Sequence, residues 1–227
     1  MNNLSKTQKT LSTIFKIVVF LSTLIGVILS VIASETTFMG SYRAFMYFTI
    51  QSNIAIAIIE IIGIFILWSK KPIGKFWYII KLVFTVSITL TFAVFTFVLA
   101  PTFAHAWSIP NVLTHLVTPI VSIIDFFFIC YEYEYKKLDV LFVTLPPLAY
   151  SIYATIAYIS KWEFAPKTYY PYFFLNWGSE AGAFGFSTKL PFMGCVYWIL
   201  LLLLFILGIG FLFVFILKII KKKHTKT

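Results

Sequence analysis

Apolar residues gather along the chain in six long stretches, separated by shorter polar connections. A membrane-spanning helix needs about 20 apolar residues to cross the hydrocarbon core, and all six stretches reach or approach that length. The expected spans cover residues 12–34, 44–68, 77–100, 111–131, 140–160 and 190–217. The pattern therefore predicts an all-α integral membrane protein, a single domain over residues 1–227 that forms a bundle of six transmembrane helices.

Composition excludes a water-soluble fold. Of the 227 residues 60% are hydrophobic and only 11% are charged, whereas an average soluble domain carries about 25% charged residues. The net charge of +10 would suit a nucleic-acid partner only on a soluble basic surface, and here the lysines flank apolar runs. We expect a multi-pass protein of the cell membrane, with membrane lipid and no nucleic acid as its partner. Cys130 and Cys195 show no metal-ligand spacing, so no metal or cofactor is expected.

Lysine and arginine are distributed unevenly between the two sides of the predicted spans. With a cytoplasmic N-terminus, 14 of them fall on the inside, Lys16 and Lys81 included, and 4 fall on the outside. Positive residues are enriched in cytoplasmic flanks, so the sequence predicts cytoplasmic N- and C-termini. A signal peptide cleaved after residues 31–33 is an alternative for the first span, although its apolar run exceeds the roughly 7 to 15 residues of such a segment.

Two of the spans carry polar residues on one helical face. In the second span Thr49, Asn53 and Glu60 lie within about 40° of one another at 100° per residue. In the fourth span an arc of about 80° holds Asn111, His115, Thr118, Ser122 and Asp125. Polar groups in hydrocarbon are costly and usually face the bundle interior. We therefore expect these two spans to be neighbours, with their polar faces turned inward.

Three charged residues are expected at one depth in the inner half of the membrane. Glu60 and Asp125 lie about 20 Å or more from the outer ends of their spans, near the level that Lys81 reaches in the third span. An isolated charge there costs about 2.5 to 3.5 kcal/mol, so Lys81 should contact at least one carboxylate. Such a network either specifies helix packing or forms a proton or ion relay.

The outer ends of the same two faces carry a candidate catalytic pair. Thr49 and His115 lie about 7 Å and 6 Å from the starts of their spans. A hydroxyl becomes a nucleophile when a base accepts its proton, and neutral imidazole suits that role near pH 7. We expect these two side chains to lie within hydrogen-bonding reach of each other or to be joined by one water. Because no acidic residue lies at the same depth, they would form a dyad and not a triad. Alternatively, both side chains serve only as backbone or interhelical hydrogen-bond partners.

Side-chain amides and an aromatic loop complete this hypothesis. Gln51, Asn53 and Asn111 can donate to an ester oxyanion in a water-poor site, and Asn111 can instead orient His115. The outer segment 161–189 is rich in aromatic rings, which favour the headgroup level. We expect it to cover the site partly as a lid, the alternative being a plain aromatic belt. The lid residues are Tyr170, Pro171, Phe173, Phe174 and Trp177.

Three motifs carry a resemblance that spans nearly the whole chain. They are residues 48–53 (FTIQSN), 114–119 (THLVTP) and 170–176 (YPYFFLN). In helix number and motif order the chain resembles a bacterial family of six-transmembrane proteins. That family is similar to the eukaryotic androgen-induced and androgen-dependent membrane proteins, which hydrolyse fatty acid esters of hydroxy fatty acids. The resemblance implies that Thr49 is the nucleophile and that His115 is its partner.

The sequence thus supports a membrane-embedded hydrolase of lipid esters that uses Thr49 and His115. The alternative is a small transporter, channel or lipid-binding protein whose polar stripes line a pathway, with Glu60, Lys81 and Asp125 as a relay. Against transport, the two halves of the chain show no inverted repeat. A purely structural or accessory role is a third possibility.

Overall fold

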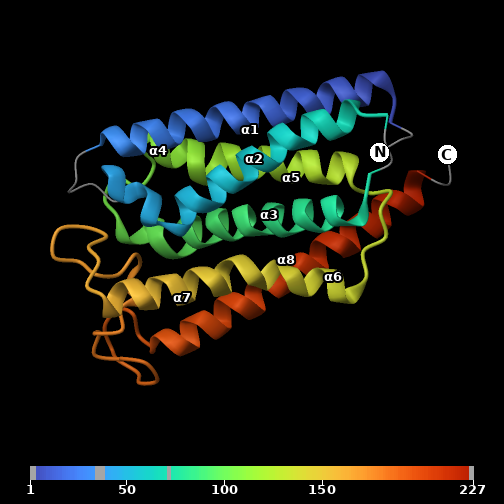
Figure 1. Ribbon diagram of the computed structural model, residues 1–227. Helices are drawn as coiled ribbons and strands as arrows, with labels where there is room; N and C mark the ends of the chain where they lie inside the picture. Colours follow the sequence, from blue (N-terminus) through green and yellow to red (C-terminus); the bar gives the residue numbers. More distant parts are fainter. Residues whose placement is uncertain (1–3, 34–38, 71–72, 225–227) are drawn as a thin grey trace.

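The computed structural model describes residues 4–33, 39–70 and 73–224, and these residues form helices and loops without a strand. Six helical segments are long and apolar enough to cross a membrane, which confirms the predicted number (Figure 1). The segments are α1 (Lys6–Ile32), α2 (Phe48–Trp68), α3 with its extensions (Lys75–Thr102), α4 to α5 (Ile109–Ile129), α6 to α7 (Lys137–Ile159) and α8 (Cys195–His224). The chain is therefore built as a multi-pass membrane protein.

The first and last helices begin at places that hydrophobicity does not mark. α1 starts six residues before the predicted apolar run, because Ser5 and Gln8 form a capping box in which each side chain accepts from the other's backbone N–H. α8 starts five residues later than predicted, because Pro191 and Gly194 lie in the preceding loop, where Gly194 approaches the backbone of Ala183 too closely for a Cβ atom.

Prolines widen two of the helices into π turns, which contact each other through the stacked rings of Phe95 and His115. The turns are η2 (Phe95–Leu99) and η4 (Leu113–Val117), and each ends two residues before a proline, Pro101 or Pro119. Proline lacks an N–H and its ring clashes with the carbonyl four residues earlier. The backbone therefore shifts to a five-residue spacing, from the N–H of Ala100 to Phe95 and from that of Thr118 to Leu113. The adjoining pieces are α3 (Lys75–Val94), η3 (Ala100–Thr102), α4 (Ile109–Val112) and α5 (Thr118–Ile129).

The fifth segment is also interrupted next to prolines, Pro146 and Pro147, but by a 3₁₀ turn and not a π turn. A short 3₁₀ turn stands before the proline pair and joins two α-helices that together make one span. The pieces are α6 (Lys137–Leu141), η5 (Phe142–Thr144) and α7 (Leu145–Ile159). Two further 3₁₀ turns lie in the connections, η1 (Tyr42–Met46) before α2 and η6 (Phe173–Leu175) before α8.

The helices form a four-membered group with a less buried pair beside it. α1 packs against α2 and α5, and α3 packs against α2, α5 and α8. Gly26 allows α1 to approach η4, since a Cβ there would collide with Thr114. α3 is the most buried of the six spans and α8 the least. In Figure 1, α7 and α8 lie on the other side of α3 from α1.

Polar side chains point inward and large apolar side chains outward, as expected for a protein in lipid. The predicted inward faces of the second and fourth spans are confirmed, because Asn53, Glu60, His115 and Asp125 are all fully buried. The exposed apolar residues include Ile14, Leu21, Ile25 and Ile28 on α1 and Leu200, Leu204, Phe211 and Phe215 on α8.

The two ends of the bundle differ in character (Figure 1). The start of α1 and the end of α8 lie at one end, which we call the terminal end. The long connection between α7 and α8, residues 160–194, lies at the opposite end, which we call the loop end. The first turn of α2 and η4 also lie towards the loop end, so Thr49 and His115 share that half of the bundle.

Candidate functional site

A closed cluster of four charges lies between α1, α2, α3 and α5. The structure brings Glu60, Lys81 and Asp125 together, as the sequence predicts, and adds Lys16 from α1. Lys16 Nζ lies 2.9 Å from Glu60 Oε2, and Lys81 Nζ lies 3.0 Å from Asp125 Oδ2. Lys16 also bonds to Asp125 and Lys81 to Glu60. Ser12 donates to the remaining Asp125 oxygen at 2.5 Å. Two positive and two negative charges thus compensate one another.

Lys16 and Lys81 do not lie in the cytoplasmic flanks, so this part of the sequence prediction is wrong. Both are buried, with side-chain exposures of 1% and 0%, so 12 flanking lysines remain against 4 outer residues. Space for Lys16 comes from Gly63, where a Cβ would lie 3.2 Å from Lys16 Cε. A signal existed in the sequence, because Ser12, Lys16, Thr23 and Ser30 follow helical spacing along one face of α1.

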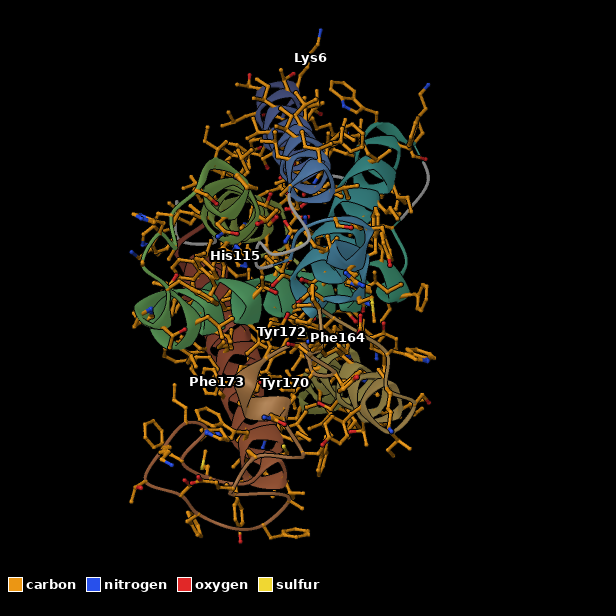
Figure 2. All side chains as sticks on the ribbon, turned by 90° about the vertical axis from the view of Figure 1, so that its left-hand side faces the viewer. Lys6, His115, Phe164, Tyr170, Tyr172 and Phe173 are labelled. Carbon is orange, nitrogen blue, oxygen red and sulfur yellow. The ribbon has the colours of Figure 1, made fainter. Side chains whose placement is uncertain are left out.

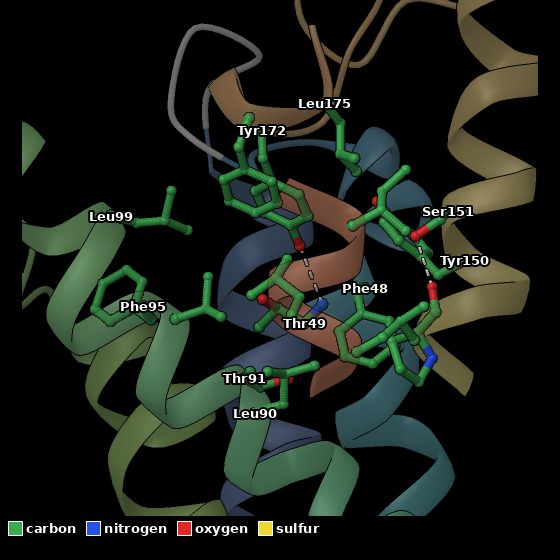
Figure 3. A pocket seen from close by; sticks show the side chains of 16 residues that line it. Phe48, Thr49, Leu90, Thr91, Phe95, Leu99, Tyr150, Ser151, Tyr172 and Leu175 are labelled. Carbon is green, nitrogen blue, oxygen red and sulfur yellow. Dashed lines mark hydrogen bonds between the residues drawn. The ribbon is translucent and has the colours of Figure 1, made fainter. Parts of the chain in front are cut away.

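Thr49 lines a cavity near the loop end, in the first turn of α2 (Figure 3). The cavity has a volume of about 50 Å³, enough for a few water molecules. Its wall is largely apolar and is formed by α2, α3, η2, α7, η6 and α8. The polar side chains in the wall are Thr49, Thr91, Tyr150, Ser151 and Tyr172.

Tyr172 descends from the connection 160–194 towards Thr49. The Thr49 backbone N–H donates to the Tyr172 hydroxyl oxygen at 3.4 Å, as Figure 3 shows. The ring is held by Tyr47 and by Phe174, which stacks on it with centroids 5.1 Å apart. Burial raises the pKa of Tyr172 to about 12, although its contact with Thr49 opposes the shift. The hydroxyl therefore keeps its proton near neutral pH and can donate it to an oxygen in the cavity.

The hydrogen bonds of His115 define which ring nitrogen carries the proton. Nδ1 lies 3.1 Å from the Asn111 carbonyl oxygen and 3.1 Å from Thr114 Oγ1. The carbonyl can only accept, and the Thr114 hydroxyl already donates to the Pro110 carbonyl. Nδ1 must therefore be the protonated nitrogen. Nε2 then presents its lone pair, and it is buried without a hydrogen-bond partner.

Thr49 and His115 share neighbours without touching through a hydrogen bond in the described parts of the chain. The side-chain NH2 group of Asn53 donates to the backbone carbonyls of both Thr49 and Thr114, at 2.8 and 3.0 Å. Phe95 lines the Thr49 cavity and stacks on the His115 ring with centroids 3.7 Å apart. His115 itself does not line that cavity. The expected dyad therefore stays a prediction. Phe95 is the side chain that both lines the Thr49 cavity and stacks on His115.

The three side-chain amides that were expected to donate to an ester oxyanion instead donate hydrogen bonds to backbone carbonyls. Gln51 is exposed and donates to the Phe45 carbonyl. Asn53 is committed to the two carbonyls named above, and Asn111 donates to Ala106. The Asn111 carbonyl, not its amide, is what orients His115. Tyr172 is one of the hydroxyl groups in the cavity wall. A single tyrosine is not distinctive in an aromatic loop, so this position could not be predicted from the sequence.

The expected lid residues divide into two groups. Phe174 lines the cavity beside Tyr172, and Phe173 packs edge-on against Trp198 of α8. Pro171 is buried, whereas Tyr170 and Trp177 are half-buried and lie outside the cavity wall. The end-on view of Figure 2 shows Tyr170, Tyr172 and Phe173 together on the connection 160–194.

Comparison with known proteins adds no assignment to this geometry. The chain matches no family model, and neither the curated proteins nor the solved structures compared with it gave a match. Within residues 4–33, 39–70 and 73–224, no three metal-ligating side chains come together.

Proposed function

We propose that this multi-pass membrane protein is a hydrolase that cleaves lipid esters with Thr49 as nucleophile and His115 as general base. The observation that carries the proposal is the state of His115, whose Nδ1–H is held by a carbonyl while Nε2 keeps an unpaired lone pair in a buried site. A general base needs that tautomer. A histidine that only linked helices would be expected to use both nitrogens.

In the proposed reaction, the Thr49 hydroxyl oxygen attacks the ester carbonyl while its proton passes to His115 Nε2. The Tyr172 hydroxyl donates to the oxyanion, which develops next to the first turn of α2. His115 then returns the proton to the departing alcohol, leaving an acyl-threonine that water hydrolyses with the same base. Because no hydrogen bond joins Thr49 to His115 and His115 does not line the cavity, the proton crosses through a water or after the Phe95 ring turns aside.

Lipid substrates are favoured because a groove on the membrane-facing side adjoins the cavity. This groove has a volume of about 390 Å³ and lies between α2, α3 and α7. It shares two residues with the cavity wall, Phe48 and Tyr150, whose rings lie 5.2 Å apart. Movement of these rings would open the cavity sideways, so that an ester could enter from the hydrocarbon.

In this proposal the loop end faces the outside and both termini face the cytoplasm of a bacterial cell. The excess of flanking lysines at the terminal end supports this orientation. The site would then meet lipids of the outer leaflet.

The test is hydrolysis of a fluorogenic long-chain acyl ester by the purified protein in detergent. Thr49→Ala and His115→Ala should each lower kcat/KM at least 100-fold, and Thr49→Ser should keep part of the activity. Ser151→Ala is the matched control, because it removes another hydroxyl from the same cavity wall, and it should change kcat/KM less than about threefold. Wild-type protein without esterase activity, or Thr49→Ala with full activity, would refute the proposal, provided that the variants melt at the wild-type temperature.

The transporter alternative has less support. A relay needs groups that exchange protons or ions with water, whereas the four charges of the cluster pair with one another and are at most 1% exposed. Proton or cation flux into liposomes that contain the protein would favour transport over hydrolysis.

A further inference from the structure

A second cavity, at the terminal end, differs from the Thr49 site in size and charge. Its volume is about 470 Å³, and it lies between the α5–α6 connection and the last turns of α8. Three lysines line it, Lys218, Lys221 and Lys222, together with one carboxylate, Glu134. The wall therefore carries a net charge of +2.

The position of these lysines along α8 places them at a membrane surface. The uninterrupted apolar part of the helix runs from Cys195 to Leu217, about 34 Å of helix, which is enough to cross the hydrocarbon core. Lys218 and the residues after it consequently lie at headgroup level. Tyr131 and Tyr133 belong to the same wall, and tyrosine favours that level.

An anion already occupies part of this lysine cluster. Lys221 Nζ lies 2.6 Å from Glu134 Oε1, and Lys221 lowers the pKa of that carboxyl group. The Glu134 side chain is 83% exposed, so the protein does not hold it in place by packing. An exposed pair of this kind contributes little to stability. A stronger anion can therefore displace the carboxylate at little cost.

An apolar groove continues from the cavity along the outer surface of the bundle. It has a volume of about 430 Å³ and shares Tyr131 with the cavity. Its other walls include Ile124, Phe127 and Phe128 of α5 and Ile220 of α8. A charged cavity at headgroup level that opens into an apolar groove matches the two parts of a phospholipid.

We propose that this cavity binds one anionic phospholipid, with its phosphate among Lys218, Lys221 and Lys222 and one acyl chain in the groove beside Tyr131. Basic cavities at the ends of membrane helices are suited to anionic headgroups. A zwitterionic lipid would bring its own positive charge against the net +2 of the wall and should bind less well. The site is independent of the proposed hydrolase activity.

The experiment measures phosphatidylglycerol and phosphatidylcholine bound to the full-length protein by native mass spectrometry in detergent. Wild type should retain one phosphatidylglycerol at least tenfold more tightly than phosphatidylcholine. The triple substitution Lys218→Gln, Lys221→Gln and Lys222→Gln should weaken phosphatidylglycerol binding at least tenfold. Lys223→Gln is the matched control, since Lys223 is on the same helix end but does not line the cavity, and it should change affinity less than twofold.

Two further variants separate a specific site from general attraction to basic residues. Glu134→Gln removes the competing carboxylate and should raise the affinity two- to fivefold. Ile124→Trp fills the groove at a position that is 46% exposed and should weaken binding at least fivefold without a change in charge.

Equal binding of the two lipids, an unaffected triple variant, or equal loss in Lys223→Gln would overturn the proposal. Full displacement by equimolar glycerol phosphate would assign the cavity to a soluble phosphate and would also overturn it. Variants are compared only when their melting temperatures match wild type.

Discussion

At the scale of residues, the buried charges of this protein are tolerable only because each carboxylate is compensated by a lysine. Lys16 contributes a second cation, without which Glu60 and Asp125 would share one lysine between two carboxylates. Breaking a buried ion pair by removing one partner typically costs about 3 to 5 kcal/mol, because the other charge is left uncompensated. Charge balance within the cluster, more than any single contact, should therefore control stability.

We predict that Lys16→Met lowers the free energy of unfolding by about 3 to 5 kcal/mol. Adding Glu60→Gln to Lys16→Met restores balance between Lys81 and Asp125, and should recover part of that loss. Lys6→Met, an exposed lysine of the same helix, serves as the control and should have an effect within about 0.5 kcal/mol. Denaturant unfolding in detergent measures these differences. A double variant less stable than Lys16→Met would contradict the charge-balance argument.

The sequence predicts Glu60, Lys81 and Asp125 as partners because a charge amid an apolar span needs compensation. It does not predict Lys16, since a lysine near the start of an apolar run looks like a flanking residue until the capping box places the helix start at Lys6. Similarly, the amide of Asn111 is visible in sequence, whereas the role of its carbonyl depends on the backbone of η4.

At the scale of elements, helix number follows from hydrophobic length, but the helix irregularities depend on tertiary packing. A proline in an apolar span indicates a break, and it does not specify whether the backbone bends or widens into a π turn. Here both π turns carry one member of the stacked pair, Phe95 in η2 and His115 in η4. π turns often occur at functional sites. The widened backbone therefore sets the position of His115 relative to the Thr49 cavity.

We predict that Pro119→Ala lowers activity of the proposed hydrolase at least tenfold while leaving the melting temperature equal or higher. Alanine supplies the N–H that lets the His115 carbonyl accept a regular α-helical bond, which would close the π turn and rotate the imidazole. Ile120→Ala, an exposed neighbour, should leave activity within twofold. Activity of Pro119→Ala equal to wild type would mean that the π turn does not position His115.

At the scale of the whole molecule, the size of the Thr49 cavity conflicts with a lipid substrate unless the protein opens. A cavity of about 50 Å³ holds only a few waters, so an acyl chain must lie elsewhere. The groove between α2, α3 and α7 offers that space, and the Phe48 and Tyr150 rings line both the groove and the Thr49 cavity. The sequence predicts a partial lid over the site but no lateral groove, because grooves between helices cannot be read from the hydrophobic pattern.

The last prediction distinguishes entry through this groove from entry beneath the connection 160–194. Ala149 is exposed on α7 and lines the groove, so Ala149→Trp should fill it with little effect on folding. If esters enter from the bilayer, kcat/KM for a long-chain ester should fall at least tenfold, while kcat/KM for a short, water-soluble ester should stay within twofold. Ile152→Trp is the matched control, because Ile152 is 56% exposed on the same helix and lies outside the groove. Equal losses for both esters would point to a damaged catalytic site. No loss for the long-chain ester would instead place the entrance at the loop, because a blocked groove cannot leave a lateral route intact.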